Sequence, residues 1–213
     1  HQFFASQVES LADAEETERM NQQAGAALLD RIGPAIVMVH SQSGSFGWLI
    51  ADARPHLVKA ILAIEPNGPP FYEVDFKGAP KWFEYTKTPP RTWGLARIPL
   101  TFDPPAKKPE DIRRKLDDAD PGEGRVRCYL QEEPARKLPR LKGIPILILA
   151  AEASYHAAYD HGTSKFLTQA GVENDFVRLE DVGLPGNGHM IMCEKNNHEV
   201  ADFLLGWLGR RLG

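Results

Sequence analysis

Long hydrophobic runs and a surplus of positive charge are both missing from this sequence. Its 213 residues carry a formal net charge of −4, whereas a nucleic-acid-binding face needs concentrated basic residues, so no nucleic-acid partner is expected. Apolar stretches such as "IPILILAA" match the length of a strand and are too short to cross a bilayer, so no membrane span is expected. Cysteine is scarce, and the sequence leaves open whether Cys128 and Cys193 pair.

The start of the chain lacks both a methionine and the basic and apolar regions of a signal peptide. It opens on His1 and continues at once into a segment typical of a helix. We therefore expect the first strands of the fold to lie outside this sequence, on a preceding or companion polypeptide. Such a start is compatible with secretion or proteolytic processing, and the sequence leaves the compartment open.

Short apolar runs alternate with helix-like segments near both ends of the chain, and 42% of all residues are hydrophobic. The order strand, turn, helix, strand predicts βαβ units, and hence an α/β fold with a mostly parallel sheet flanked by helices. Expected strands cover residues 35–39, 60–64, 144–150 and 174–181. Expected helices cover residues 8–31, 46 to about 55, 164–171 and 197–212.

Residues 71–142 differ from the rest because prolines and charges are dense and tryptophans stand among them. A long irregular stretch inside a compact domain is usually functional or disordered, and the aromatic residues favour a folded segment. We predict a cap over a core made of residues 1–70 and 143–213, with short helices near 108–118 and 124–133. Trp82, Trp93 and Met190 are the expected lining of a substrate pocket.

Three serines crowd the end of the first expected strand, in "HSQSGS" at residues 40–45. A nucleophile elbow needs small residues two positions before and after its serine. Ser41 fails this test because Val39 precedes it, whereas Ser43 and Ser45 pass. The nearness of the strand end favours Ser43. The alternative is a turn in which the hydroxyls bond neighbouring backbone groups.

A partner for the serine is expected in the glycine-rich loop "LPGNGHMIM", where His189 follows the last expected strand. Serine, acid and histidine follow in that order in α/β-hydrolases. His156 and His161 compete as the base, and with Glu152 and Asp160 they would suggest a metal site. Nothing else in the sequence has metal-ligand spacing, so no metal is expected.

Two carboxylates could orient the imidazole of His189. Glu65 follows the second expected strand and Glu152 follows the third. The spacing alone favours Glu152. Either side chain could instead bond the amides of its own turn.

Three separated motifs resemble a group of α/β-hydrolase esterases. They are "HSQSG" at 40–44, "IEPNG" at 64–68, and "GNGHMIM" with "EKNN" between 186 and 197. The resemblance covers most of the chain outside residues 71–142. It implies an α/β-hydrolase fold with a cap insertion. The oxyanion loop of that group, an "HG"-type segment after an early strand, has no counterpart here.

Carried over residue by residue, the resemblance implies Ser43 as nucleophile, Glu65 as acid and His189 as base. It overrides the spacing argument for Glu152, which stays the alternative acid. The amide of Gly44 would be one oxyanion donor, and the second would come from outside this sequence.

The expected activity is cleavage of a carboxylic ester or lactone, a small-molecule substrate, through an acyl-enzyme and without a cofactor. Amide or peptide cleavage and acyl transfer would use the same triad and stay open. A non-catalytic binding module with an incomplete oxyanion hole is the other alternative. The oligomeric state is open, a homodimer included.

Overall fold

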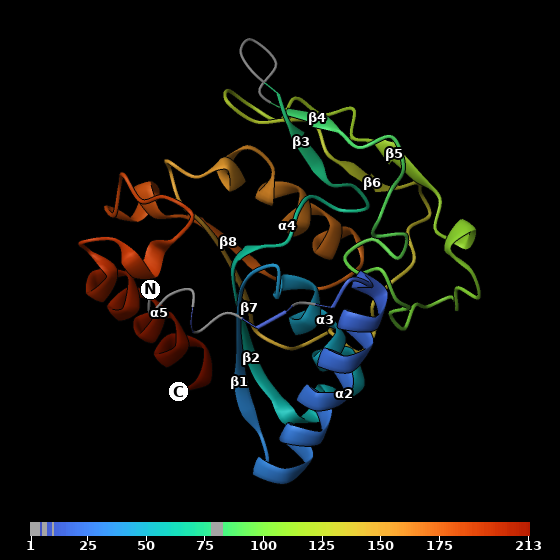
Figure 1. The fold of residues 1–213 in the computed structure, drawn as a ribbon, viewed down its shortest axis with the longest axis horizontal. Helices are drawn as coiled ribbons and strands as arrows, with labels where there is room; N and C mark the ends of the chain where they lie inside the picture. The colour runs from blue at the N-terminus through green and yellow to red at the C-terminus, as the bar shows by residue number, and fades with distance from the viewer. Residues whose placement is uncertain (1–4, 6–7, 10, 78–82) are drawn as a thin grey trace.

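A four-stranded parallel sheet forms the centre of the molecule (Figure 1). The computed structural model describes residues 5, 8–9, 11–77 and 83–213. The sheet order is β1 (Ala35–Ser41), β2 (Val58–Pro66), β7 (Ile146–Ala150) and β8 (Asp175–Arg178). All three strand pairs are parallel, which confirms the predicted α/β fold with a parallel sheet.

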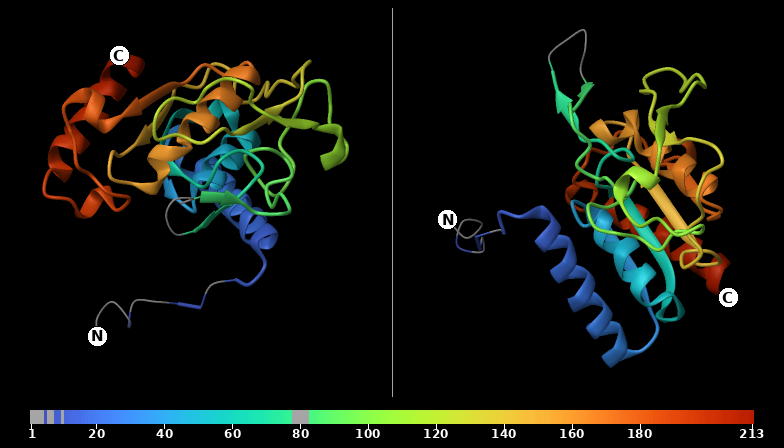
Figure 2. Two further views of the ribbon diagram at one scale, coloured as in Figure 1. Left: turned by 90° about the horizontal axis from the view of Figure 1, so that it is seen from above. Right: turned by 90° about the vertical axis from the view of Figure 1, so that its right-hand side faces the viewer.

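Helices cover both faces of this sheet, and the residues of β2 alternate between them. Ile61 and Ala63 pack into the same core cluster as α3 (Gly44–Ala53) and α4 (Asp160–Gln169). Leu62 and Ile64 face the opposite way, against α5 (Asn197–Leu212). Helix α2 (Ala14–Ile32) packs beside α3, on the side away from α5 (Figures 1 and 2). This two-sided burial explains why residues 60–64 of β2 and the whole of β7 are apolar.

The expected helices are present, and three of them start at other residues than predicted. α2 begins at Ala14 and not at residue 8, because the Asp13 side chain accepts hydrogen bonds from the amides of Glu15 and Glu16 and so caps the helix. α3 begins at Gly44, two residues before the expected position, and α4 begins at Asp160, four residues before. The bounds of α5 agree with the expected 197–212.

The two short helices predicted near 108–118 and 124–133 are wrong. Those stretches hold an antiparallel pair of strands, β5 (Arg114–Leu116) and β6 (Tyr129–Gln131), with a single 3₁₀ turn before it. Gly122 and Gly124 lie between the strands with φ of +86° and +70°, which a helix does not allow. A second antiparallel pair joins β3 (Val74–Phe76) to β4 (Phe83–Tyr85).

Much of the expected cap packs into the main core. Trp93, Leu100 and Phe102 belong to the buried cluster that also holds Trp48 and Ile61. This segment therefore shares its hydrophobic core with the sheet. The strand pair β3–β4 projects from it (Figures 1 and 2), while β6 packs against the core through Tyr129 and Leu130. The division of the chain into core and cap stays a prediction.

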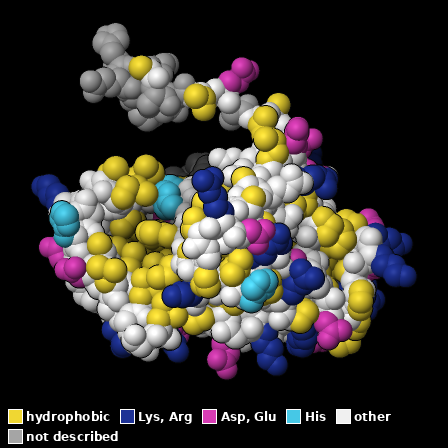
Figure 3. All heavy atoms as spheres, turned by 90° about the horizontal axis from the view of Figure 1, so that it is seen from below, with side chains coloured by type: hydrophobic (Ala, Val, Ile, Leu, Met, Phe, Trp, Pro, Cys, Tyr) yellow, Lys and Arg dark blue, Asp and Glu magenta, His cyan; other side chains and the backbone are white. Residues whose placement is uncertain are grey.

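Strand β1 pairs only with β2 among the described residues, so its other edge has no strand beside it. On the α5 face, Ile36 and Met38 of β1 are 40% and 58% exposed. Met38 lines a groove of about 330 Å³ between β1 and α5, together with Ile64 and Leu204. Figure 3 shows this hollow floored with hydrophobic side chains. No helix in the described part of the chain is long and apolar enough to span a membrane.

Candidate active site

The chain reverses direction sharply where β1 ends. Ser41 is the last residue of the strand and has φ of +55°, a left-handed conformation that is strained for a residue with a side chain. The amide of Ser43 donates to the carbonyl of His40 at 3.1 Å, and α3 starts one residue later at Gly44. A strand, a strained serine and an immediate helix together have the form of a nucleophile elbow.

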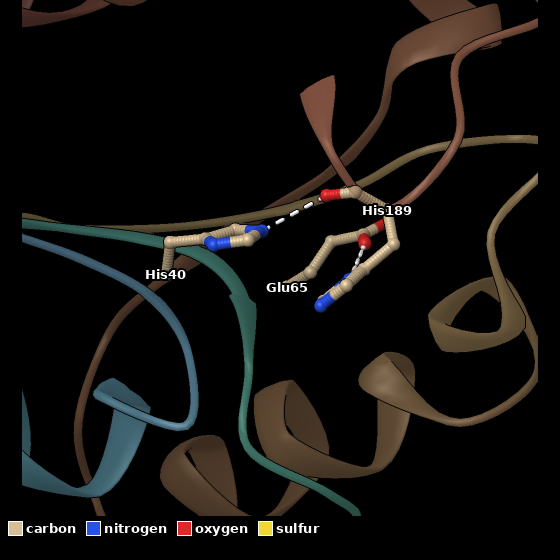
Figure 4. Close-up of side chains that lie close together, drawn as sticks. All are labelled: His40, Glu65 and His189. Atoms are coloured by element: carbon tan, nitrogen blue, oxygen red, sulfur yellow. Dashed lines mark hydrogen bonds and ion pairs between the residues drawn. The ribbon is translucent and has the colours of Figure 1, made fainter. Parts of the chain in front are cut away.

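The hydroxyl of Ser41 contacts a histidine that is 148 residues further along the chain. The Ser41 Oγ and His189 Nε2 atoms are 2.8 Å apart, and the His189 Nδ1 and Glu65 Oε2 atoms are 2.5 Å apart. Figure 4 shows the imidazole of His189 turned toward the Glu65 carboxylate. Serine, imidazole and carboxylate form one continuous chain of hydrogen bonds.

Glu65 is completely buried at the carboxyl end of β2, with φ of +44°. Its carboxylate accepts two more hydrogen bonds, from the Ala151 amide to Oε1 and from the Ser154 hydroxyl to Oε2, both at 2.8 Å. These donors stabilise the charged form of a carboxylate held away from water.

Ser43 does not contact His189, which corrects the expected position of the serine in this arrangement. Its hydroxyl donates to the carbonyl of His40 at 2.8 Å and accepts from the His40 amide at 2.9 Å. This is the turn-stabilising role that the sequence offered as the alternative. The serine brought to His189 is Ser41, two positions earlier.

The size test excluded Ser41 because of Val39, but the structure accommodates this valine two positions before Ser41. The space is provided by a glycine in the helix that packs on the strand. A Cβ atom on Gly47 would lie 3.1 Å from Val39 Cγ1, closer than side chains normally approach. The valine therefore fits two positions before Ser41 because Gly47 has no side chain.

The amide that follows Ser41 differs from the one expected to follow Ser43. The residue after Ser41 is Gln42, whose amide has no hydrogen-bond acceptor among the described residues. Gly44, the expected donor, is buried at the start of α3, where a Cβ would lie 2.5 Å from the Asn67 amide nitrogen. Its lack of a side chain lets α3 approach the end of β2.

Glu152, the alternative acid, lies away from the imidazole. It is exposed, and its Oε2 atom accepts a hydrogen bond from the Gly186 amide at 2.8 Å. This bond ties the loop that carries His189 to the end of β7. Glu152 thus contacts the histidine loop while Glu65 contacts the histidine itself.

Three aromatic rings surround His189. The ring centroids of His40, His156 and Tyr155 lie 4.6, 4.7 and 4.8 Å from that of His189. His40 also donates from Nε2 to the backbone carbonyl of His189 at 2.9 Å, a contact drawn in Figure 4. Burial raises the pKa of Tyr155, and a hydrogen bond with Ser41 opposes that shift.

His156 forms a hydrogen bond with Asp160, with 2.9 Å between His156 Nδ1 and Asp160 Oδ1, and both side chains are buried. Burial lowers the pKa of His156 to about 4 and raises the pKa of Asp160 well above its usual range. The sequence singled out His156 only as a competing base and metal ligand. Its packing against His189 is a tertiary contact with no sequence signal.

Ligand atoms of His40, Glu65 and His189 lie within 4.8 Å of one another, close enough to hold a metal ion. Each of these side chains already has a hydrogen-bonding partner, namely His189 with Glu65 and Ser41, and His40 with the His189 carbonyl. An ion would have to displace those bonds. Among the described residues, the histidines and carboxylates considered as a metal site in the sequence do not form such a group.

Of the residues expected to line a substrate pocket, the two that the structure describes do not lie together. Trp82 lies outside the described residues, and Trp93 is 7% exposed within the main core. Met190 follows His189 directly and is 53% exposed. Beside the elbow, a pocket of about 210 Å³ is lined by polar side chains that include Gln42 and Glu18.

Both cysteines are free: Cys128 is buried and Cys193 is exposed.

The fold matches that of a known esterase. A bacterial esterase described as novel shares it with a TM-score of 0.50 and 21% sequence identity, over 88% of this chain and 42% of that chain. No protein-family model matches the chain. The protein is therefore an α/β protein with a parallel sheet flanked by helices, similar in fold to an esterase.

A relative is evident in sequence as well. Over 210 residues the chain is 44% identical to a fungal protein described as the probable secreted lipase phiG, from Fungal sp. (strain ATCC 74256). That alignment covers 98% of this chain and 55% of the relative, so the chain spans about half the length of the curated relative it matches.

Proposed function

We propose that this chain carries the catalytic triad of a serine hydrolase that cleaves carboxylic esters, with Ser41 as nucleophile, His189 as base and Glu65 as the orienting acid. The contact of His189 with Ser41 on one side and Glu65 on the other carries the proposal. The 44% identity to a protein described as a probable lipase supports an ester as the substrate.

The reaction follows from the hydrogen-bond directions. Glu65 accepts the proton of His189 Nδ1, which leaves Nε2 as the acceptor that faces Ser41. Ser41 Oγ attacks the ester carbonyl while its proton moves to Nε2, and the imidazolium then gives this proton to the leaving alcohol. Water, deprotonated by the same nitrogen, attacks the acyl-enzyme, and the acid product leaves with Ser41 restored.

The amide of Gln42 is suited to stabilise the oxyanion, because it follows the nucleophile directly and has no internal acceptor among the described residues. Amide cleavage and acyl transfer would use the same groups. The ester is favoured over them by the relative alone.

The elbow is tested by two alanine variants of matched chemistry. Ser41→Ala should abolish both hydrolysis of an aryl ester and labelling by a fluorophosphonate probe, because it removes the attacking oxygen. Ser43→Ala removes only the hydroxyl that bonds the His40 backbone and should still be labelled. Labelling that survives in Ser41→Ala and disappears in Ser43→Ala would assign the nucleophile to Ser43 instead.

We further infer that a second oxyanion donor comes from polypeptide that packs along the free edge of β1. The backbone of this strand is unpaired on that edge among the described residues, and Ile36 and Met38 are exposed beside it. Ser41 ends the same strand, so chain added at this edge would reach the oxyanion position. The greater length of the relative supports a further segment or companion chain.

A further inference from the structure

A buried histidine lies flat against the proposed catalytic base. The rings of His156 and His189 are stacked, with centroids 4.7 Å apart and planes inclined by 3°. The other two rings around His189, those of His40 and Tyr155, are tilted by 32° and 46°. Only His156 thus presents a parallel face to the imidazole among the described rings.

The position of His156 is fixed by contacts on both its side chain and its backbone. Its Nδ1 atom is 2.9 Å from Asp160 Oδ1, and Asp160 is the first residue of α4. Its amide donates to Ser154 Oγ at 3.2 Å, and the same hydroxyl donates to Glu65 Oε2 at 2.8 Å. One serine therefore bonds both the backbone of His156 and the carboxylate of Glu65.

We propose that His156 is a positioning residue, whose ring fixes the plane of His189 so that Nδ1 faces Glu65 and Nε2 faces Ser41. This inference rests on the proposed function, in which His189 is the base. A planar ring with hydrogen bonds at both edges can still rotate out of its plane about the line that joins them. A parallel ring on its face blocks that rotation in one direction.

The charge of the pair suits this role. Burial lowers the pKa of His156 to about 4, so its imidazole is uncharged near neutral pH, and burial raises the pKa of Asp160. Glu65 and Glu73 oppose the lowering at His156, and Arg91 adds to it. During the reaction His189 holds the proton of Ser41 and is positively charged. An uncharged His156 ring can stack on this imidazolium, whereas a charged His156 ring would repel it.

Two sets of variants separate the ring from its hydrogen bond. His156→Gln keeps a group that can bond Asp160 and removes the ring. His156→Phe combined with Asp160→Asn keeps a ring and leaves no unpaired buried carboxyl. Asp160→Asn alone is the control, since an amide can still bond His156. His156→Asn is a second ringless variant in case His156→Gln does not fold.

Loss of the ring should lower kcat with aryl ester substrate by about 100-fold, the scale for misplacement of a catalytic group, and leave KM unchanged. The Phe/Asn double variant and the Asp160→Asn control should keep most of kcat. Thermal unfolding of each variant reports folding. Equal losses of kcat in the ringless and ring-bearing variants would overturn the proposal, because the ring would not be what matters.

A second measurement does not depend on turnover. The His189 Nδ1 proton, in its short contact with Glu65, should give a low-field proton resonance in the NMR spectrum of the full-length protein. We expect that resonance to weaken in His156→Gln and to persist in the Phe/Asn variant. An unchanged resonance in folded His156→Gln overturns the positioning role. An active Ser41→Ala variant would instead overturn the proposed function, and the NMR comparison of the His156 variants would not be affected by it.

Discussion

Replacement of Glu65 by glutamine should abolish the proposed ester hydrolysis while leaving the fold intact. The carboxylate accepts three hydrogen bonds, from the Ala151 amide on Oε1 and from Ser154 and His189 on Oε2. Glutamine has one acceptor oxygen and one donor NH₂ group. Because the Ala151 amide can only donate, the oxygen must face it, and the NH₂ group must face Ser154 and His189.

This swap reverses the hydrogen bond to the imidazole. With an NH₂ group opposite Nδ1, His189 must accept at Nδ1 and carry its proton on Nε2, where it points at Ser41. That tautomer cannot take the serine proton. The same exchange of carboxylate for amide in a serine protease triad costs about 10⁴-fold in kcat, which is about 5 kcal/mol of transition-state stabilisation.

Glu152→Gln is the matched control. Glu152 is exposed and accepts from the Gly186 amide, a bond that the carbonyl oxygen of glutamine can also accept. Its kcat should stay near that of the wild type. Steady-state hydrolysis of an aryl ester measures kcat, and thermal unfolding shows whether each variant is folded.

Two results would refute the reasoning. Folded Glu65→Gln that keeps kcat within about tenfold of the wild type would mean that the carboxylate does not set the tautomer of His189. A large loss in Glu152→Gln with little loss in Glu65→Gln would make Glu152 the acid, as the spacing in the sequence favoured.

Two further predictions concern pH and the free sheet edge. His161 is 6% exposed and burial lowers its pKa to about 4, so below pH 6.5 the unfolded chain binds a proton that the folded chain does not. The stability that comes from keeping His161 uncharged is present above pH 6.5 and is lost as pH falls toward 4. The free energy of unfolding, measured with denaturant, should therefore drop between pH 7 and pH 5 by about 2 kcal/mol more in the wild type than in His161→Gln. Equal drops in the two proteins would contradict this prediction. Residues 1–213 expressed alone should show kcat about 100-fold or more below the same chain supplied with the polypeptide proposed at β1, on the scale of one lost oxyanion donor. Equal kcat, with an intact mass that excludes a companion chain in the first preparation, would remove the need for that polypeptide.

The layered arrangement could be predicted from the sequence because its signals are local. Apolar runs such as 60–64 are buried in a parallel sheet, and the last helix begins and ends where its pattern indicated. Residues 71–142 were harder to interpret, because three-residue strands such as β5 and β6 have no periodicity to detect. Burial of Trp93 in the main core depends on contacts with distant residues that composition does not encode.

The sequence favoured Ser43, two residues from the serine that contacts His189, and this difference has a physical source. The rule that small residues flank the elbow serine expresses a need for space between strand and helix, and it does not state which residue must provide that space. Here Val39 on the strand has a large side chain, and the space for it comes from Gly47, eight residues later in α3, which has none. Ser43 then serves the turn by bonding both polar groups of the His40 backbone, which frees Ser41 to stand at the strained end of β1. A test for an elbow should therefore sum the volumes of both packed faces, strand and helix together, before it rejects a serine for one large neighbour.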